Sequence, residues 1–215
     1  MKRLIGSWLL TSLAVTIYAQ PAETGLKIEV HIYNYAGASP ETLVRAERET
    51  ARIYERAGIA MGWLICPLSP EELAQNTTCD VPAQPTRLTL RLLSNEMAQR
   101  FPVGGDIFGF ALLPVYGGFG VVANVFADRA RDMAPDEELH RVLLGHLIAH
   151  ELGHLLLGEA GHSAGAGIMH VPWQTKELEQ IKRGVMWFLP GQTERIRAQI
   201  LARTVGTGDL LAPHR

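Results

Sequence analysis

Two histidines four residues apart, with a glutamate directly after the first, form the most chemically informative part of the sequence. His150 and His154 enclose the run His-Glu-Leu-Gly-His. On an α-helix, side chains four residues apart lie on one face, so both imidazoles can reach the same metal ion. Glu151 then points toward an open coordination position, where a carboxylate can act as a general base. The spacing therefore predicts a metal site with Glu151 as the catalytic residue.

The residues around this pair predict a helix that is buried on almost every side. Its polar side chains form one strip made of His146, His150, Glu151 and His154. Burying these groups without partners would cost several kcal/mol, and a divalent cation removes that cost. His146 lies one turn before the pair, and we interpret it as a hydrogen-bonded core residue beside the site. The apolar residues that cover the other directions are Leu139, Val142, Leu144, Ile148, Leu152, Leu155 and Leu156.

A third ligand is expected from the segment that follows the helix. Gly158 is a natural helix terminator, because glycine adopts the left-handed conformation without penalty. A chain that reverses there can bring His162 back toward the metal. Two alternatives stay open at this stage. His162 can be an ordinary loop histidine, or the third ligand can be one of three rivals further along the chain. These rivals are His170, Glu177 and Glu179.

The segment from His150 to Met169 resembles the metzincin clan of zinc peptidases. That clan carries the pattern HExxHxxGxxH, followed by a methionine turn beneath the zinc. The run Gly-Ile-Met-His at 167–170 is similar to this turn, especially as astacin-like members have it. The resemblance implies a Zn²⁺-dependent endopeptidase that cleaves peptides or proteins. The roles that it implies are zinc ligands at His150, His154 and His162, a general base at Glu151 and a structural floor at Met169.

The sequence departs from the clan pattern at three positions. Gly158 lies one residue later than in the pattern, and His162 lies two residues later. Val171 stands where astacin-like turns have a tyrosine that helps to hold the transition-state oxyanion, so His170 or another side chain must supply that help. The HELGHLLLG core is similar to that of uncharacterised secreted metallopeptidase-like proteins of bacteria. Without the clan resemblance, Met169 would be interpreted as simple core filling.

The first 19 residues have the features of a secretory signal peptide. Lys2 and Arg3 precede an apolar stretch over 4–18, and a small residue, Ala19, stands at the expected cleavage point. The alternative is a membrane anchor, but the stretch is shorter than the roughly 20 residues of a spanning helix. We therefore expect a secreted or periplasmic protein that makes no membrane contact after cleavage. Residues 20–215 are then a single catalytic domain of ordinary size.

Composition and cysteine content bear on the partners of the chain and on its disulfide. A formal net charge of −2 and a pI near 6.4 give no reason to expect nucleic-acid binding. We expect a monomer. An exported chain folds in an oxidising compartment, so Cys66 and Cys79 are expected to form a disulfide. The alternative is that both are unpaired small apolar residues.

The remaining pattern predicts an α+β fold of zincin or metzincin type. It has a mixed twisted sheet, a long active-site helix and a smaller helical C-terminal part. The pair of strands at 108–113 and 120–127 is favoured as the substrate-binding edge, although their glycines can equally serve the turn alone. On polarity, His31 is expected to be solvated, and so are Arg195, Arg197 and Arg203 on the last helix. Strands are predicted at 26–35, 59–66, 87–93, 108–113 and 120–127, helices at 40–57, 177–181 and 192–204, and a surface loop at 67–85.

Overall fold

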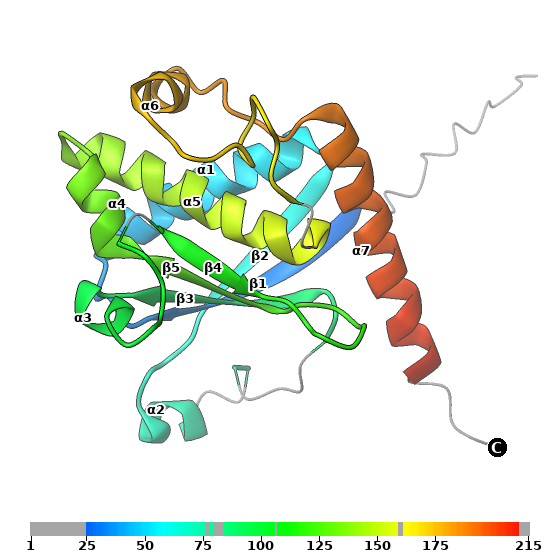
Figure 1. The fold of residues 1–215 in the computed structure, drawn as a ribbon. Helices are drawn as coiled ribbons and strands as arrows, with labels where there is room; N and C mark the ends of the chain where they lie inside the picture. Colours follow the sequence, from blue (N-terminus) through cyan, green and yellow to red (C-terminus); the bar gives the residue numbers. More distant parts are fainter. Residues whose placement is uncertain (1–24, 76–77, 80–83, 106, 159–160, 211–215) are drawn as a thin grey trace, which may run out of the picture.

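A five-stranded sheet carries the long helix α5 (Glu137–Leu157) and the helix α1 (Pro40–Arg56) on one face (Figure 1). The computed structural model describes residues 25–75, 78–79, 84–105, 107–158 and 161–210. The expected signal peptide therefore lies outside the described residues. None of the described helices is long and apolar enough to cross a membrane.

The sheet is mixed, as the sequence predicts. Its strands lie in the order β2-β1-β3-β5-β4. All neighbouring strands run parallel except β4, which pairs antiparallel with β5 and forms one edge of the sheet. The α+β fold class is thus confirmed. The strands are β1 (Leu26–Asn34), β2 (Ile59–Ile65), β3 (Arg87–Leu93), β4 (Gly109–Leu112) and β5 (Val122–Phe126).

The predicted elements match the observed ones to within a few residues, but three short helices were missed. Helix α4 has no side-chain cap at its start, so it carries no N-terminal signal in the sequence. Helix α2 lies inside the stretch that was predicted as a loop only. The remaining helices are α2 (Pro70–Gln75), α3 (Asn95–Ala98), α4 (Ala127–Met133), α6 (Thr175–Lys182) and α7 (Pro190–Leu210).

Helices α1 and α5 pack so closely that side chains of α1 donate hydrogen bonds to backbone carbonyls of α5. The Thr50 hydroxyl donates to the carbonyl of Gly145 at 2.8 Å, and the Tyr54 hydroxyl donates to that of Ala149 at 3.2 Å. A Cβ at position 145 would lie 2.7 Å from the carbonyl oxygen of Ala46, so only glycine permits this approach. These contacts hold α5 against α1.

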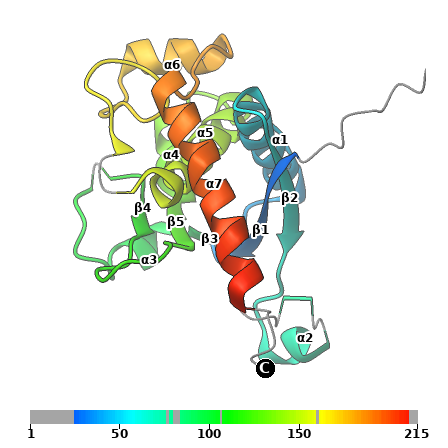
Figure 2. The ribbon, with the colours of Figure 1, turned by 90° about the vertical axis from the view of Figure 1, so that its right-hand side faces the viewer.

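Arg203 corrects one sequence-based expectation, because it is fully buried instead of solvated. Figure 2 shows its helix, α7, running along the end of the sheet. The guanidinium donates to the carbonyl oxygens of Pro85, Gly120 and Leu155 at 2.7, 3.0 and 2.5 Å. Burial lowers its pKa to about 10, so it remains charged at neutral pH. This one side chain joins three segments that are distant in sequence.

The two other arginines are more exposed, yet each also bonds a carbonyl oxygen. Arg195 donates to Leu157, the last residue of α5, and Arg197 donates to Ala57 at the end of α1. A purely solvated arginine face is therefore wrong for α7. The three arginines thus hydrogen-bond α7 to α5, to the end of α1 and to the loops before β3 and β5.

His31 was likewise expected to be solvated, but it is only 3% exposed. Its β1 neighbours Val30 and Ile32 face the core beneath α1 and α5, so His31 points to the opposite face of the sheet. Helix α2 lies on that face (Figure 1). The expected disulfide is present there, joining Cys66 to Cys79.

We expect Arg203→Met to lower the free energy of unfolding by about 2–4 kcal/mol, because three buried carbonyls lose a charged donor. Urea unfolding followed by circular dichroism measures the change. Arg197→Met is the matched control on the same helix, where a more exposed arginine bonds a single carbonyl; its loss should stay below about 1 kcal/mol. Equal losses in both variants would contradict the role given to Arg203.

Candidate metal centre

Helix α5 holds His150 and His154 in place through well-formed ends. At its start, the Asp136 carboxylate accepts a hydrogen bond from the backbone N–H of Leu139 at 2.7 Å. This cap satisfies a backbone donor that has no partner within the helix. At its end, Gly158 adopts a φ of 75°, as the terminator role requires. Both histidines lie in the last two turns, next to the chain reversal.

The reversal after Gly158 brings His162 to the other two histidines. One ring nitrogen from each of His150, His154 and His162 lies within 4.8 Å of the other two. The Nε2 atoms of His150 and His154 are only 3.1 Å apart. The site is graded in exposure, from buried His150 through half-buried His154 to exposed His162. The two extra residues in the spacing therefore do not keep His162 away from the pair.

Hydrogen bonding and burial prepare these imidazoles to act as neutral ligands. His150 Nδ1 lies 2.8 Å from the carbonyl oxygen of Ile168, so Nδ1 carries the proton and Nε2 presents its lone pair. Burial lowers the pKa of His150 to about 4 and that of His154 to about 3. Burial also lowers the pKa of His162. Lone pairs that converge in this way are satisfied by a cation, and three imidazoles are a donor set that Zn²⁺ accepts.

Glu151 lies beside this cluster with no hydrogen bond to its Oε2 from the described residues. The side chain is 4% exposed, and burial raises its pKa to about 8. Its Cγ and Cδ pack against Gly109 at the start of β4, where an added Cβ would lie 2.7 and 2.8 Å from them. An unsatisfied buried carboxyl is costly, and a nearby cation offsets that cost. The residues present therefore fit a metal ion.

Met169 is fully buried and packs against two glycines, one in α5 and one in the loop that carries His162. A Cβ on Gly153 would lie 2.7 Å from the Met169 sulfur, and one on Gly161 would lie 3.4 Å from its methyl carbon. The loop that carries His162 is closed just above it, since the Ser163 N–H donates to the Met169 carbonyl at 3.0 Å. This position suits a floor for the site and equally suits core filling.

The rival ligands lie elsewhere. Glu177 accepts from the backbone N–H of Gln174 in the cap of α6, and Glu179 pairs with Lys182. His170 contacts the Ser163 carbonyl at 3.3 Å and lies 3.9 Å from Glu177. Over the described ranges, two groups of His, Cys, Asp and Glu are close enough to hold a metal, and none of the rivals belongs to either. The geometry thus favours His162 over all three.

Sequence reasoning found some neighbours of the site and missed others. Trp173, four residues after Met169, packs edge-on to His150 with ring centroids 5.6 Å apart. His146 is fully buried and hydrogen-bonded to the Val142 carbonyl at 3.0 Å, as interpreted. Neither the carbonyl of Ile168 nor the close approach of Gly109 was anticipated. The carbonyl of Ile168 is a backbone acceptor, which has no sequence signature. Gly109 contacts Glu151, which is 42 positions away in the sequence.

Comparison with known proteins gives a likeness of fold. No protein-family model and no curated protein sequence matches the chain. Among solved structures, it is similar to archaemetzincin from Methanopyrus kandleri at 19% identity and a TM-score of 0.51, covering 83% of this chain and 98% of that one. A weaker likeness to myroilysin, at 12% identity and a TM-score of 0.31, covers 77% of this chain and 70% of that one. The chain therefore has a zincin-like fold.

We expect Gly109→Ala to lower the free energy of unfolding by about 1–3 kcal/mol, because the new methyl group overpacks the gap between β4 and α5. Besides the Glu151 side chain, the methyl group would meet the Asn124 carbonyl oxygen at 2.5 Å. Gly105→Ala is the matched control, since nothing lies within 4 Å of its Cβ position. Denaturant unfolding compares the two variants. Equal stability would show that Glu151 and β4 are not in close contact.

Proposed function

We propose that this chain is an exported, monomeric, zinc-dependent endopeptidase. The observation that carries the proposal is the convergence of three histidine side chains beside a buried carboxyl that lacks a hydrogen bond to one of its oxygens. A purely structural zinc site has four protein ligands and no use for such a carboxyl group. Hydrolysis of a peptide bond needs both parts together.

His150, His154 and His162 would hold the zinc, and Met169 would lie beneath it if the run at 167–170 acts as a methionine turn. Zinc in a site with three protein ligands supplies a Lewis acid that polarises a water molecule and the substrate carbonyl. Glu151 follows a ligand directly in the sequence and accepts the proton of that water. It then returns the proton to the leaving amine.

The edge strand β4 supports an extended polypeptide as the substrate. One side of β4 pairs with β5, and the described strands place no further strand beyond it. A peptide can add to such an edge through main-chain hydrogen bonds. Because Gly109 of β4 contacts Glu151, a peptide bound along β4 would run past the general base. This supports the strand pair favoured from the sequence, with β4 as its edge member.

A second candidate function is a secreted zinc-binding protein that does not cleave. Val171, which is exposed, favours it, because valine cannot donate the hydrogen bond that the tyrosine of astacin-like turns gives to the oxyanion. His170 is the polar residue that this turn offers instead, and it contacts Ser163 and Glu177. Glu151 argues against this candidate, since a binding protein has no need of a buried carboxyl beside an open ligand position.

We expect Glu151→Gln to abolish cleavage of casein or gelatin, with a fall of about 10²–10⁴-fold, because the amide cannot accept the proton. The variant should retain one zinc per chain, measured by atomic emission. Removing the metal with a chelator should stop cleavage by the unmodified chain, and added zinc should restore it. Activity that survives both treatments would exclude the mechanism. Zinc binding without turnover in the unmodified chain would favour the non-catalytic candidate.

We expect His162→Ala to weaken zinc binding by more than the roughly 100-fold that the loss of an outer hydrogen-bonding partner costs, since a direct ligand is removed. Titration against a fluorescent zinc chelator measures the affinity. Glu179→Gln is the control, because Glu179 is one of the alternative third ligands. It should leave the zinc affinity unchanged. If zinc affinity falls in Glu179→Gln and is unchanged in His162→Ala, His162 is not the third ligand.

A further inference from the structure

A second group of potential metal ligands lies on the face of the sheet opposite α5. His31 of β1 points to this face, and Cys66 and Cys79 lie beside it. The three residues are 3%, 3% and 7% exposed. One ring nitrogen of His31 and the two sulfur atoms all lie within 4.8 Å of one another. In the described structure the two sulfurs are joined as a disulfide.

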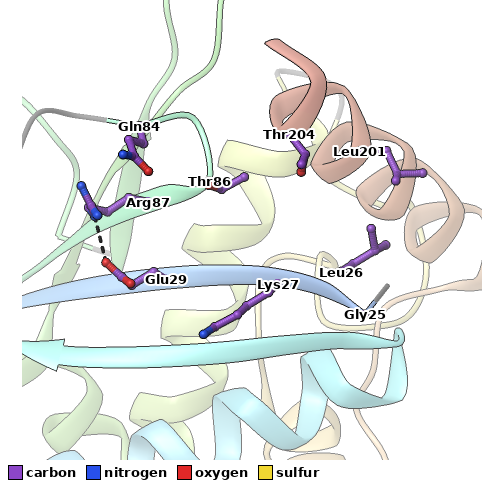
Figure 3. A pocket seen from close by; sticks show the side chains of 9 residues that line it. All are labelled: Gly25, Leu26, Lys27, Glu29, Gln84, Thr86, Arg87, Leu201 and Thr204. Carbon is purple, nitrogen blue, oxygen red and sulfur yellow. Dashed lines mark hydrogen bonds and ion pairs between the residues drawn. The ribbon is translucent and has the colours of Figure 1, made fainter. Parts of the chain in front are cut away.

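The surroundings of His31 resemble those of a metal-binding histidine. Its Nε2 lies 2.7 Å from a carboxylate oxygen of Glu29, two residues earlier on the same face of β1. Arg87 of β3 donates to that oxygen at 2.8 Å, as Figure 3 shows. A histidine that binds a metal usually donates its other ring N–H to a carboxylate, which fixes the tautomer. With Nε2 protonated toward Glu29, Nδ1 is the nitrogen with a lone pair.

The backbone positions of the cysteines also suit a shared ion. Their Cα atoms are 5.8 Å apart. Two thiolates on one tetrahedral zinc lie about 3.8 Å from each other, because each Zn–S bond is about 2.3 Å long. Rotation about the Cα–Cβ bonds can provide that separation, so the strand ends do not have to move. Glu29 also lines a cavity of about 450 Å³, so solvent reaches the outer side of the group.

We propose that reduction of the disulfide turns His31, Cys66 and Cys79 into a second zinc site. A dithiol reductant gives two electrons and two protons to the S–S bond, which breaks, and the reductant becomes a disulfide. Zinc then forms two bonds to sulfur and one to Nδ1 of His31, and the two thiol protons pass to solvent. The fourth position is left for water.

This site has a structural consequence for the segment between the cysteines. The segment follows β2, whose end is held to β1 by a hydrogen bond from the Cys66 N–H to the Ile32 carbonyl. A disulfide closes the segment under oxidising conditions, and zinc closes it at the same two residues under reducing conditions. The fold then has a cross-link at this place in both kinds of compartment.

The test uses the full chain with zinc already bound at the first site. After reduction with a phosphine, which carries no thiol to compete for metal, the chain is titrated with Co²⁺. The reduced chain should take up one additional equivalent and show thiolate-to-cobalt charge-transfer absorption, which a site of histidines alone cannot give. The oxidised chain and the Cys66→Ser/Cys79→Ser variant should show neither.

Two variants test whether His31 and Glu29 belong to the site. Glu29→Gln should weaken cobalt binding by roughly 10–100-fold, and His31→Ala should weaken it further. His140→Ala is the matched control, because His140 is also buried and contacts a carboxylate but lies outside both sites. It should leave the affinity unchanged.

Two results would overturn the proposal. One is a reduced chain that takes up no additional cobalt. The other is charge-transfer absorption of equal strength in His31→Ala, which would mean that the thiols bind metal without the folded site. A chain that unfolds on reduction would give this second result, so loss of the fold also counts against the proposal.

Discussion

The structure depends on burying a helix that carries charged and polar groups. Helix α5 packs against the sheet on one side and α1 on another, so His146, His150 and Glu151 lose nearly all contact with water. Each needs a replacement partner. His146 has the Val142 carbonyl and His150 has the Ile168 carbonyl. At the C-terminal end of the helix, Oε2 of Glu151 has no hydrogen-bond partner among the described residues, and the ring nitrogens of the three histidines converge beside it.

The rest of the fold holds that end of α5 in position. Gly145 and Gly153 let α1 and Met169 approach the helix closely. Arg203 and Arg195 of α7 bond the carbonyls of Leu155 and Leu157, which follow directly after His154. Carbonyls at a helix end have no partner within the helix, so basic side chains are well placed there. The last helix therefore supports the site without contributing a ligand to it.

The two faces of the sheet serve different purposes. The face under α5 is apolar and packs against the helix that carries His150 and His154. The other face carries Glu29, His31 and the disulfide, with Arg87 holding Glu29. Alternation along β1 separates the two sets, because successive side chains point in opposite directions. Strand β1 thus contributes Val30 and Ile32 to the core and the buried His31 to the opposite face.

Much of the fold was predictable from the sequence because the signals are local. Alternation marked β1 and β3, the terminator Gly158 marked the end of α5, and the spacing of His150 and His154 placed both on one helical face. Predictions failed where a partner comes from a distant segment. Arg203 was expected to be solvated because its helix is amphipathic, yet it is buried and bonds carbonyls of two loops and of α5. His31 was expected to be solvated because it belongs to the polar set of β1, yet it is buried beside Cys66 and Cys79.

The sequence alone therefore determined the helix, its two histidines, its glutamate and the cysteine pair, because each follows from spacing within one element or from residue type. The tertiary structure alone decided that His162, and not His170 or Glu177, lies beside the pair. It also decided that β4 is the edge strand next to Glu151. The path of a loop and the order of strands depend on packing between distant segments, which no local periodicity records.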